Sequence, residues 1–293
     1  MHEFLSNYMA EWLAESIAHS IKILPFLFFV FLFIEIFEIF FAKKFRSFLK
    51  NSKKGGPVLG ATLATIPQCG FSIIASTLYS ERFISRGTII AVFLATSDEA
   101  IPVLLMYPEF ISYILPLIVV KLLIAIPVGY LIDLLIKGFK KPILSKEDNE
   151  GKIKIFHRHN FEQLRKRDIL WHPIKHTLNV FVFLLLITIL LNYLMSAFDI
   201  ASIFKGALSA ITPLFASLIG LIPNCAVSVA LVLMFVKGTI SFGAMTSGLL
   251  TSGGIGILIL CKNNKSKRDT LFILTLLVLV GYISGLLIQT FWG

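Results

Sequence analysis

The chain has 293 residues, 56% of them hydrophobic, with a mean hydropathy of +0.84 and a formal net charge of +10. This apolar share is well above that of a soluble domain and indicates an integral membrane protein. The positive charge does not indicate nucleic-acid binding, because the Lys and Arg residues are concentrated in short segments between apolar runs, as in the cytoplasmic loops of membrane proteins.

An N-terminal segment and a series of apolar runs follow one another along the chain. Residues 1–18 lack a basic start and a small-residue cleavage site, so we expect an amphipathic segment at the membrane surface and not a signal peptide. Runs of about 20 apolar residues can cross a hydrocarbon layer about 30 Å thick, and we therefore expect an all-α polytopic membrane protein. The runs cover residues 21–41, 57–80, 87–107, 111–136, 176–198, 203–236, 239–261 and 270–292.

Two of these runs carry the same short pattern of a proline, an amide and a cysteine. The copies begin 156 residues apart, and other motifs recur at nearly the same interval. We therefore predict two diverged repeats, with a first membrane repeat over 1–137, a basic cytoplasmic loop over 138–171 and a second membrane repeat over 172–293. The matched motifs are IPQCGFS (Pro67, Gln68, Cys69) with IPNCAVS (Pro223, Asn224, Cys225), Ser85-x-Gly87 with Ser241-x-Gly243, and TSDEA from Thr96 with TSGGI from Thr251, the last pair at an interval of 155.

The basic clusters Lys43–Lys54, Lys137–Lys175 and Lys262–Arg268 indicate the topology. Short basic loops stay in the cytoplasm. All three clusters do so if runs 57–80 and 203–236 each enter the membrane and return as a hairpin, with proline disrupting the helix at each tip. Each repeat then has five segments, about ten in all, and the second copy is inverted, with both termini outside. A longer first arm that includes residues 45–56 would cross fully and give the same parity.

The hairpin tips, Pro67–Gly70 and Pro223–Cys225, are candidate binding sites. In membrane transporters, helix breaks in matching positions of two repeats usually locate the substrate. Gln68 and Asn224 offer amide donors and acceptors, and the thiolates of Cys69 and Cys225 are soft metal ligands. The alternative is that the cysteines are small core residues and the amides cap exposed backbone.

The TSDEA segment is the second candidate site. Asp98 and Glu99 are adjacent carboxylates inside an apolar run, where a charge is costly unless it is paired, protonated or coordinated. With the hydroxyls of Thr96, Ser97, Thr251 and Ser252, they predict an oxygen-rich site for a divalent cation near the hairpin tips. The alternative is a helix end near water. The residues expected to break helices around both sites are Pro67, Gly70, Pro102, Pro223, Gly253 and Gly254.

Four further groups are less decisive. Glu35 and Glu38 share one face of the first helix, where they carry protons or attract cations, or else lie at the interface. Lys121 either pairs with a carboxylate or extends outward. Cys261 has no counterpart in the first repeat and is expected to be a packing residue. The loop histidines, which are solvated residues or a cytoplasmic metal sensor, are His157, His159, His172 and His176.

The PQCGFS, TSDEAIP and PNCAVS segments together resemble a bacterial family of ten-helix heavy-metal exporters, also described as manganese transporters or arsenic efflux proteins. The resemblance extends over nearly the whole chain and implies a secondary transporter. The related arsenical permeases carry two neighbouring cysteines where this chain has Cys69 alone, so the carboxylates favour a cation over an arsenical. The resemblance points to Pro67, Gln68, Cys69, Gly70, Ser97, Asp98, Glu99, Pro102, Pro223, Asn224 and Cys225.

The sequence thus predicts a transporter and not an enzyme. It has no GxxxxGK[ST] nucleotide loop and no HExxH pattern. We expect export of a divalent or heavy-metal cation such as manganese across the inner (cytoplasmic) membrane, by alternating access with proton or sodium coupling. We expect no permanently bound cofactor. The expected partners are the lipid bilayer, the transported ion and, in a homo-oligomer, further copies of the chain.

Two alternatives remain open. One is an ion-coupled carrier of an arsenical, oxyanion or organic anion, whose charge the helix N-termini would hold. The other is a channel or sensor in which the loop histidines detect metal.

Overall fold

The computed structural model describes residues 55–67, 69–96, 100–135, 211–264 and 266–292, with Phe29, Leu49, Val182 and Leu186. The regular elements within these ranges are all helices. In chain order they are α3 (Gly56–Ala64), α4 (Cys69–Ser80), α5 (Arg86–Ala95), α6 (Ala100–Leu105), the 3-10 helix η1 (Pro108–Tyr113), α7 (Ile114–Leu135), α10 (Thr212–Gly220), α11 (Cys225–Val236), α12 (Phe242–Thr251), α13 (Ile255–Asn263) and α14 (Lys267–Trp292).

Four stretches of the described chain are long and apolar enough to cross a membrane. They are Arg86–Leu105, Pro108–Leu135, Phe242–Asn263 and Lys267–Phe291. The first contains α5 and α6 and the third contains α12 and α13, so two of the four are divided into shorter helices. Within the described ranges, the predicted all-helical, polytopic membrane protein is therefore confirmed.

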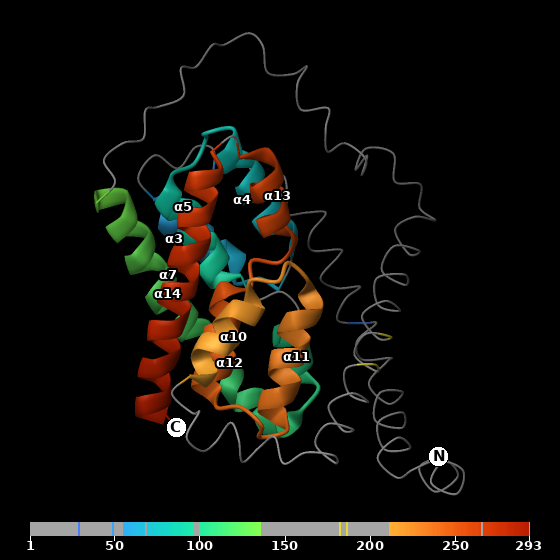
Figure 1. Cartoon of the computed structure of the whole chain (residues 1–293). Helices are drawn as coiled ribbons and strands as arrows, with labels where there is room; N and C mark the ends of the chain where they lie inside the picture. Colours follow the sequence, from blue (N-terminus) through green and yellow to red (C-terminus); the bar gives the residue numbers. More distant parts are fainter. Residues whose placement is uncertain are drawn as a thin grey trace, which may run out of the picture.

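α3 and α4 form one pair of short helices, and α10 and α11 form another. α3 and α10 have nine residues each, and α4 and α11 have twelve. At 1.5 Å per residue none of them can cross about 30 Å of hydrocarbon alone. Both helices of the first pair lie in the upper half of Figure 1, and both helices of the second pair lie in the lower half.

At both hairpin tips the helices are interrupted beside the prolines. The first interruption falls between Ala64 and Cys69, around Pro67, and the second falls between Gly220 and Cys225, around Pro223. Prolines also lie in the first turns of α3 and α10, where the missing N–H costs nothing.

The described helices fall into a first half, α3 to α7, and a second half, α10 to α14. The central helix of each half packs against the same kind of neighbours. α5 packs between α3 and α7, and α12 packs between α10 and α14. Each packing includes a pair of glycines in close contact. A Cβ atom on Gly87 would lie 2.0 Å from the Gly129 carbonyl oxygen, and one on Gly243 would lie 2.5 Å from that of Gly285. Small residues allow membrane helices this approach, and the two pairs are 156 residues apart.

The short helices after the breaks pack across the two halves. α13 packs against α4, and α6 packs against α11. The apolar core is divided accordingly into two clusters, one including Phe71 and Phe93, the other including Val103 and Val232. The long helices α7 and α14 expose leucines along their length, for example Leu123 and Leu287, as lipid-facing helices do.

Two sequence-based predictions need correction. The interval of 155 between TSDEA and TSGGI is wrong by one, because α5 ends at Ala95 and α12 ends at Thr251. In a chain of two such repeats, Thr96 would therefore correspond to Ser252. The prediction that Cys261 is a packing residue is also wrong. Its side chain is exposed, on the face of α13 that also exposes Ile255 and Leu258.

Candidate functional site at the helix breaks

The break between α12 and α13 is formed by Ser252, Gly253 and Gly254. Ser252 caps the end of α12, and Gly254 has φ 53° and ψ −145° before α13 begins. Residues other than glycine rarely adopt this backbone conformation. The helix is interrupted at these two glycines, and the interruption frees backbone groups that a continuous helix would pair.

This break lies against both hairpins. The hydroxyl oxygens of Ser252 and Ser228, in the first turn of α11, are 2.8 Å apart. Two residues beyond the break, the Gly256 carbonyl oxygen accepts a 2.8 Å hydrogen bond from the Ser76 hydroxyl on α4. A Cβ atom on Gly256 would lie 2.7 Å from the Ser72 Cβ atom, so the glycine allows α13 to contact the beginning of α4. The α12–α13 break thus brings together arms of the two hairpins.

The end of α5 reaches the same region. A Cβ atom on Gly253 would lie 2.9 Å from the Phe93 ring. Three residues later, Thr96 leaves the helix with φ −58° and ψ 131°. The two divided helices therefore approach each other at the ends of α5 and α12, where the sequence predicts the oxygen-rich site.

The threonines at these two helix ends are fully buried, and their hydroxyls donate to backbone. Thr96 Oγ1 donates to the Val92 carbonyl at 2.7 Å. Thr251 Oγ1 shares its proton between the Ser217 and Gly248 carbonyls, at 2.8 and 2.9 Å. A hydroxyl that donates keeps its lone pairs as acceptors, so both oxygens remain suitable ligands for a cation.

Lys121 is a buried cation beside the end of α5, where the stretch formed by α5 and α6 is interrupted. Its side chain is 0% exposed on α7, and its ammonium donates a hydrogen bond to the Thr96 carbonyl oxygen. It therefore does not extend to the surface. The carbonyl end of a helix favours a positive charge, and Lys121 supplies one at the end of α5. The corresponding residue on α14 is Leu277, which is also 0% exposed.

The other predicted site residues that the structure describes lie at the hairpin tips and in α6. Asn224 lies in the second tip, with an exposed side chain and a backbone N–H that donates to Ile222 at 2.7 Å. Cys69 and Cys225 are the first residues of α4 and α11, and Gly70 follows in the first turn of α4. Pro102 is buried in the first turn of α6, so the break precedes it. Gln68, Ser97, Asp98, Glu99, Glu35 and Glu38 lie outside the described residues.

No three His, Cys, Asp or Glu side chains in the described ranges lie close enough together to hold a metal ion. The predicted carboxylates of Asp98 and Glu99 lie outside these ranges. Ser72, Ser76 and Ser228 contact the region of the α12–α13 break and are not among the predicted site residues. For two of them the sequence carries a signal, because Ser72 and Ser228 occupy equivalent places in CGFS and CAVS, 156 residues apart.

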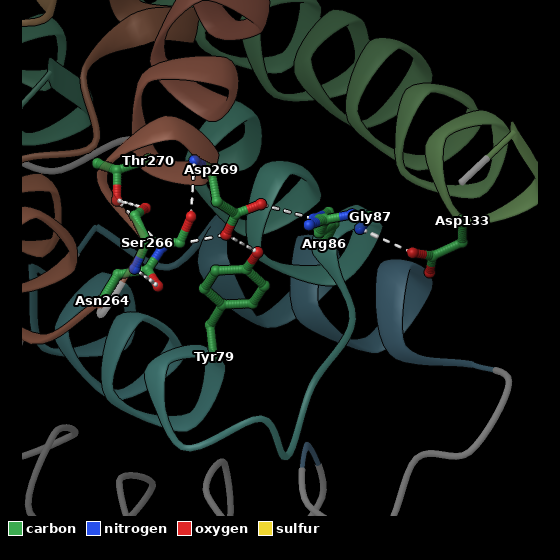
Figure 2. A network of polar contacts seen from close by, with 8 residues as sticks. All are labelled: Tyr79, Arg86, Gly87, Asp133, Asn264, Ser266, Asp269 and Thr270. Atoms are coloured by element: carbon green, nitrogen blue, oxygen red, sulfur yellow. Dashed lines mark hydrogen bonds and ion pairs between the residues drawn. The ribbon is translucent and has the colours of Figure 1, made fainter. Parts of the chain in front are cut away.

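A polar cluster lies at the end of the molecule where α4 ends and α14 begins (Figure 2). The Asp269 carboxylate accepts hydrogen bonds from Arg86 Nε at 2.6 Å and from the Tyr79 hydroxyl at 2.5 Å. It also accepts one from Asn264 Nδ2 at 3.0 Å. Tyr79 lies in the last turn of α4, outside the four spanning stretches. Burial and then the bond to Asp269 raise the pKa of its phenol, which therefore stays protonated and donates.

Comparison with known proteins assigns a family. A family model described as "Putative, 10TM heavy-metal exporter" matches residues 10–214, more than half of the chain. The match includes the PQCG and TSDEA segments and ends in α10, before the second tip. Neither a curated protein nor a solved structure matches the chain. The chain belongs to this family of heavy-metal exporters.

Proposed function

We propose that the protein is a secondary active transporter that exports a divalent or heavy-metal cation, such as Mn²⁺, by alternating access. The observation that carries this proposal is the convergence at the α12–α13 break. Ser228 from one hairpin and Ser76 from the other both bond to residues of this region, and Phe93 of α5 contacts Gly253. Broken helices that meet inside a membrane protein supply polar groups to a substrate that lipid would exclude.

Inverted repeats would give this site two alternative openings. The repeated glycine contacts support the repeat, as do two matched turns, in which Arg82 has φ 63° and Gly238, 156 residues later, has φ 67°. Inversion is supported by the two hairpins lying in opposite halves of Figure 1. We place the repeats within 1–137 and 172–293, joined by a basic cytoplasmic loop over 138–171. Both chain termini then lie on the outer side of the inner membrane.

The proposed cation ligands combine both repeats. Asp98 and Glu99 follow Thr96, which is the last described residue before α6. Their carboxylates would supply the charge for a divalent ion. Gln68, Cys69, Asn224 and Cys225 would complete the site from the two tips. A carboxylate must lose its proton to bind metal, so proton exchange at Asp98 or Glu99 would couple export to a proton gradient. Sodium is the alternative coupling ion.

Lys121 favours a second candidate, an anion carrier. Its buried ammonium lies beside the end of α5, and the helices α11 and α13 begin near the α12–α13 break. A buried ammonium together with helix N-termini attracts a negative substrate. In that mechanism Asp98 and Glu99 would bind only the coupling ion.

Flux into proteoliposomes tests both candidates. The assay compares Mn, Fe, Zn, Co and Cd ions with arsenite, using the parent chain, Asp98→Asn and Cys69→Ala. Cys261→Ala is the matched control, because Cys261 is exposed and outside the site. We expect metal flux that Asp98→Asn lowers at least about tenfold and that Cys261→Ala leaves unchanged. Flux of arsenite or another anion without any metal flux would replace the cation carrier with the anion carrier, and no flux of any kind would favour a sensor.

A further inference from the structure

The Tyr79–Arg86–Asp269 cluster joins parts of the chain that belong to different proposed repeats. Tyr79 ends α4 and Arg86 begins α5, whereas Asp269 lies in the first turn of α14. Figure 2 shows both side chains reaching toward the one carboxylate. Asp269 is therefore the acceptor through which the first half is attached to the second at this end of the molecule.

Arg86 is held firmly on its own side of this contact. The carboxylate of Asp133, on α7, accepts a 2.8 Å hydrogen bond from the Gly87 N–H and a 2.5 Å bond from the Ser85 hydroxyl. The residues on either side of Arg86 are thus tied to α7. On the other side, Asn264 Nδ2 bonds to Asp269 and to Thr270 at 3.0 Å each, within the second half. If the two halves moved apart here, the Arg86–Asp269 and Tyr79–Asp269 bonds would break, and the Ser76–Gly256 bond lies next to them along α4.

The same three positions recur at the opposite end with different chemistry. The residues 156 positions away are Phe235 for Tyr79, Phe242 for Arg86 and Tyr113 for Asp269. Tyr113 contacts the Phe235 and Phe242 rings with centroid distances of 5.2 and 5.4 Å. This aromatic cluster also joins the halves, because Tyr113 ends η1 and the two phenylalanines lie on α11 and α12. Both contacts are formed in the structure at once.

We propose that the Tyr79–Arg86–Asp269 cluster is the cytoplasmic gate of the transport cycle and that Tyr113, Phe235 and Phe242 form the opposing gate. The inference rests on the proposed alternating access, in which only one end opens at a time. The polar cluster adjoins the basic segment 262–268, which favours the cytoplasmic side for it. Separated charges regain hydration when this gate opens to water, whereas separated aromatic rings lose contact and gain none.

Sided labelling tests the gates without any substrate. The three native cysteines are replaced by alanine, and Ser252→Cys places one thiol at the α12–α13 break, where Ser252 is buried. A membrane-impermeant maleimide is added to inside-out or right-side-out membrane vesicles. We expect Asp269→Asn to raise the labelling rate about tenfold from the cytoplasmic face alone. Tyr113→Ala, its counterpart at the opposing gate, should raise labelling from the outer face alone.

Two further variants address loss of folding. Tyr79→Phe keeps the ring and removes one bond to Asp269, so a smaller cytoplasmic increase is expected. Combining Arg86→Asp with Asp269→Arg restores the opposite charges and should return labelling toward the parent rate. Unchanged labelling in Asp269→Asn and Tyr79→Phe would overturn the gate, as would an increase from the outer face. If the sided response appears and no metal moves in the flux assay, the gate stands and the proposed cargo is wrong.

Discussion

Ser228, at the beginning of α11, and Ser252, at the end of α12, lie with their hydroxyl oxygens 2.8 Å apart in the buried interior. The bond ties a hairpin arm to the break between α12 and α13. The bond from Ser76 to Gly256 ties the other hairpin to the same region.

We expect the two serines to be energetically coupled. A buried hydroxyl pair of this kind contributes about 1 kcal/mol, and removal of one partner leaves the other unpaired. Ser228→Ala and Ser252→Ala should each lower the unfolding midpoint in detergent, and the double variant should cost less than their sum. Strictly additive losses would show that the hydroxyls do not interact.

Gly256→Ala should destabilise the protein markedly. The added methyl would lie 2.7 Å from the Ser72 Cβ atom and 2.8 Å from its backbone. Backbone cannot move aside cheaply, so we expect a loss of about 1–3 kcal/mol in unfolding free energy. Gly55→Ala is the control, because its nearest neighbour would be the Leu59 side chain at 3.8 Å. Thermal unfolding of the two variants side by side tests the prediction, and equal midpoints would contradict it.

Lys121→Met distinguishes a cation carrier from an anion carrier. It removes the buried ammonium at the Thr96 carbonyl but keeps a long side chain of similar shape. In a cation carrier the loss of this positive charge should tighten metal binding severalfold, whereas in an anion carrier it should abolish substrate binding. Calorimetric titration measures both. Leu277→Met, at the corresponding buried position on α14, is the control and should change neither.

Alkaline pH should weaken the fold through Tyr107, in the segment between α6 and η1. Burial raises the pKa of its phenol to about 12, from about 10 in an unfolded chain. The protonated phenol is the form that the fold favours, so its contribution is complete below about pH 10 and is lost as the pH rises toward 12. Tyr107→Phe should therefore lose less stability over this interval than the parent chain. Parallel unfolding curves across the interval would rule out this role.

The sequence predicts the helix breaks well because their causes are local. Proline lacks a donor wherever it occurs, and Gly253-Gly254 allows the left-handed backbone that the structure has at Gly254. The interval between Thr96 and its counterpart was wrong by one because repeated letters suggest an alignment, while the helix ends determine it.

The remaining errors and omissions have causes that the sequence does not contain. The sequence predicts a packing role for Cys261 because lipid is as apolar as a protein core, so composition does not separate the two faces of α13. Lys121 could be buried or extended, and its bond to Thr96 decides between them. Tyr79 and Asp269 are 190 residues apart, and no local pattern relates them.

The packing of α4 on α13 and of α6 on α11 bears on the ancestry of the protein. In a chain made of the two proposed repeats, each copy covers an apolar flank that the other leaves bare. A precursor with a single copy would have been stable only as a pair, with its two members inserted in the bilayer in opposite orientations before duplication and fusion joined them.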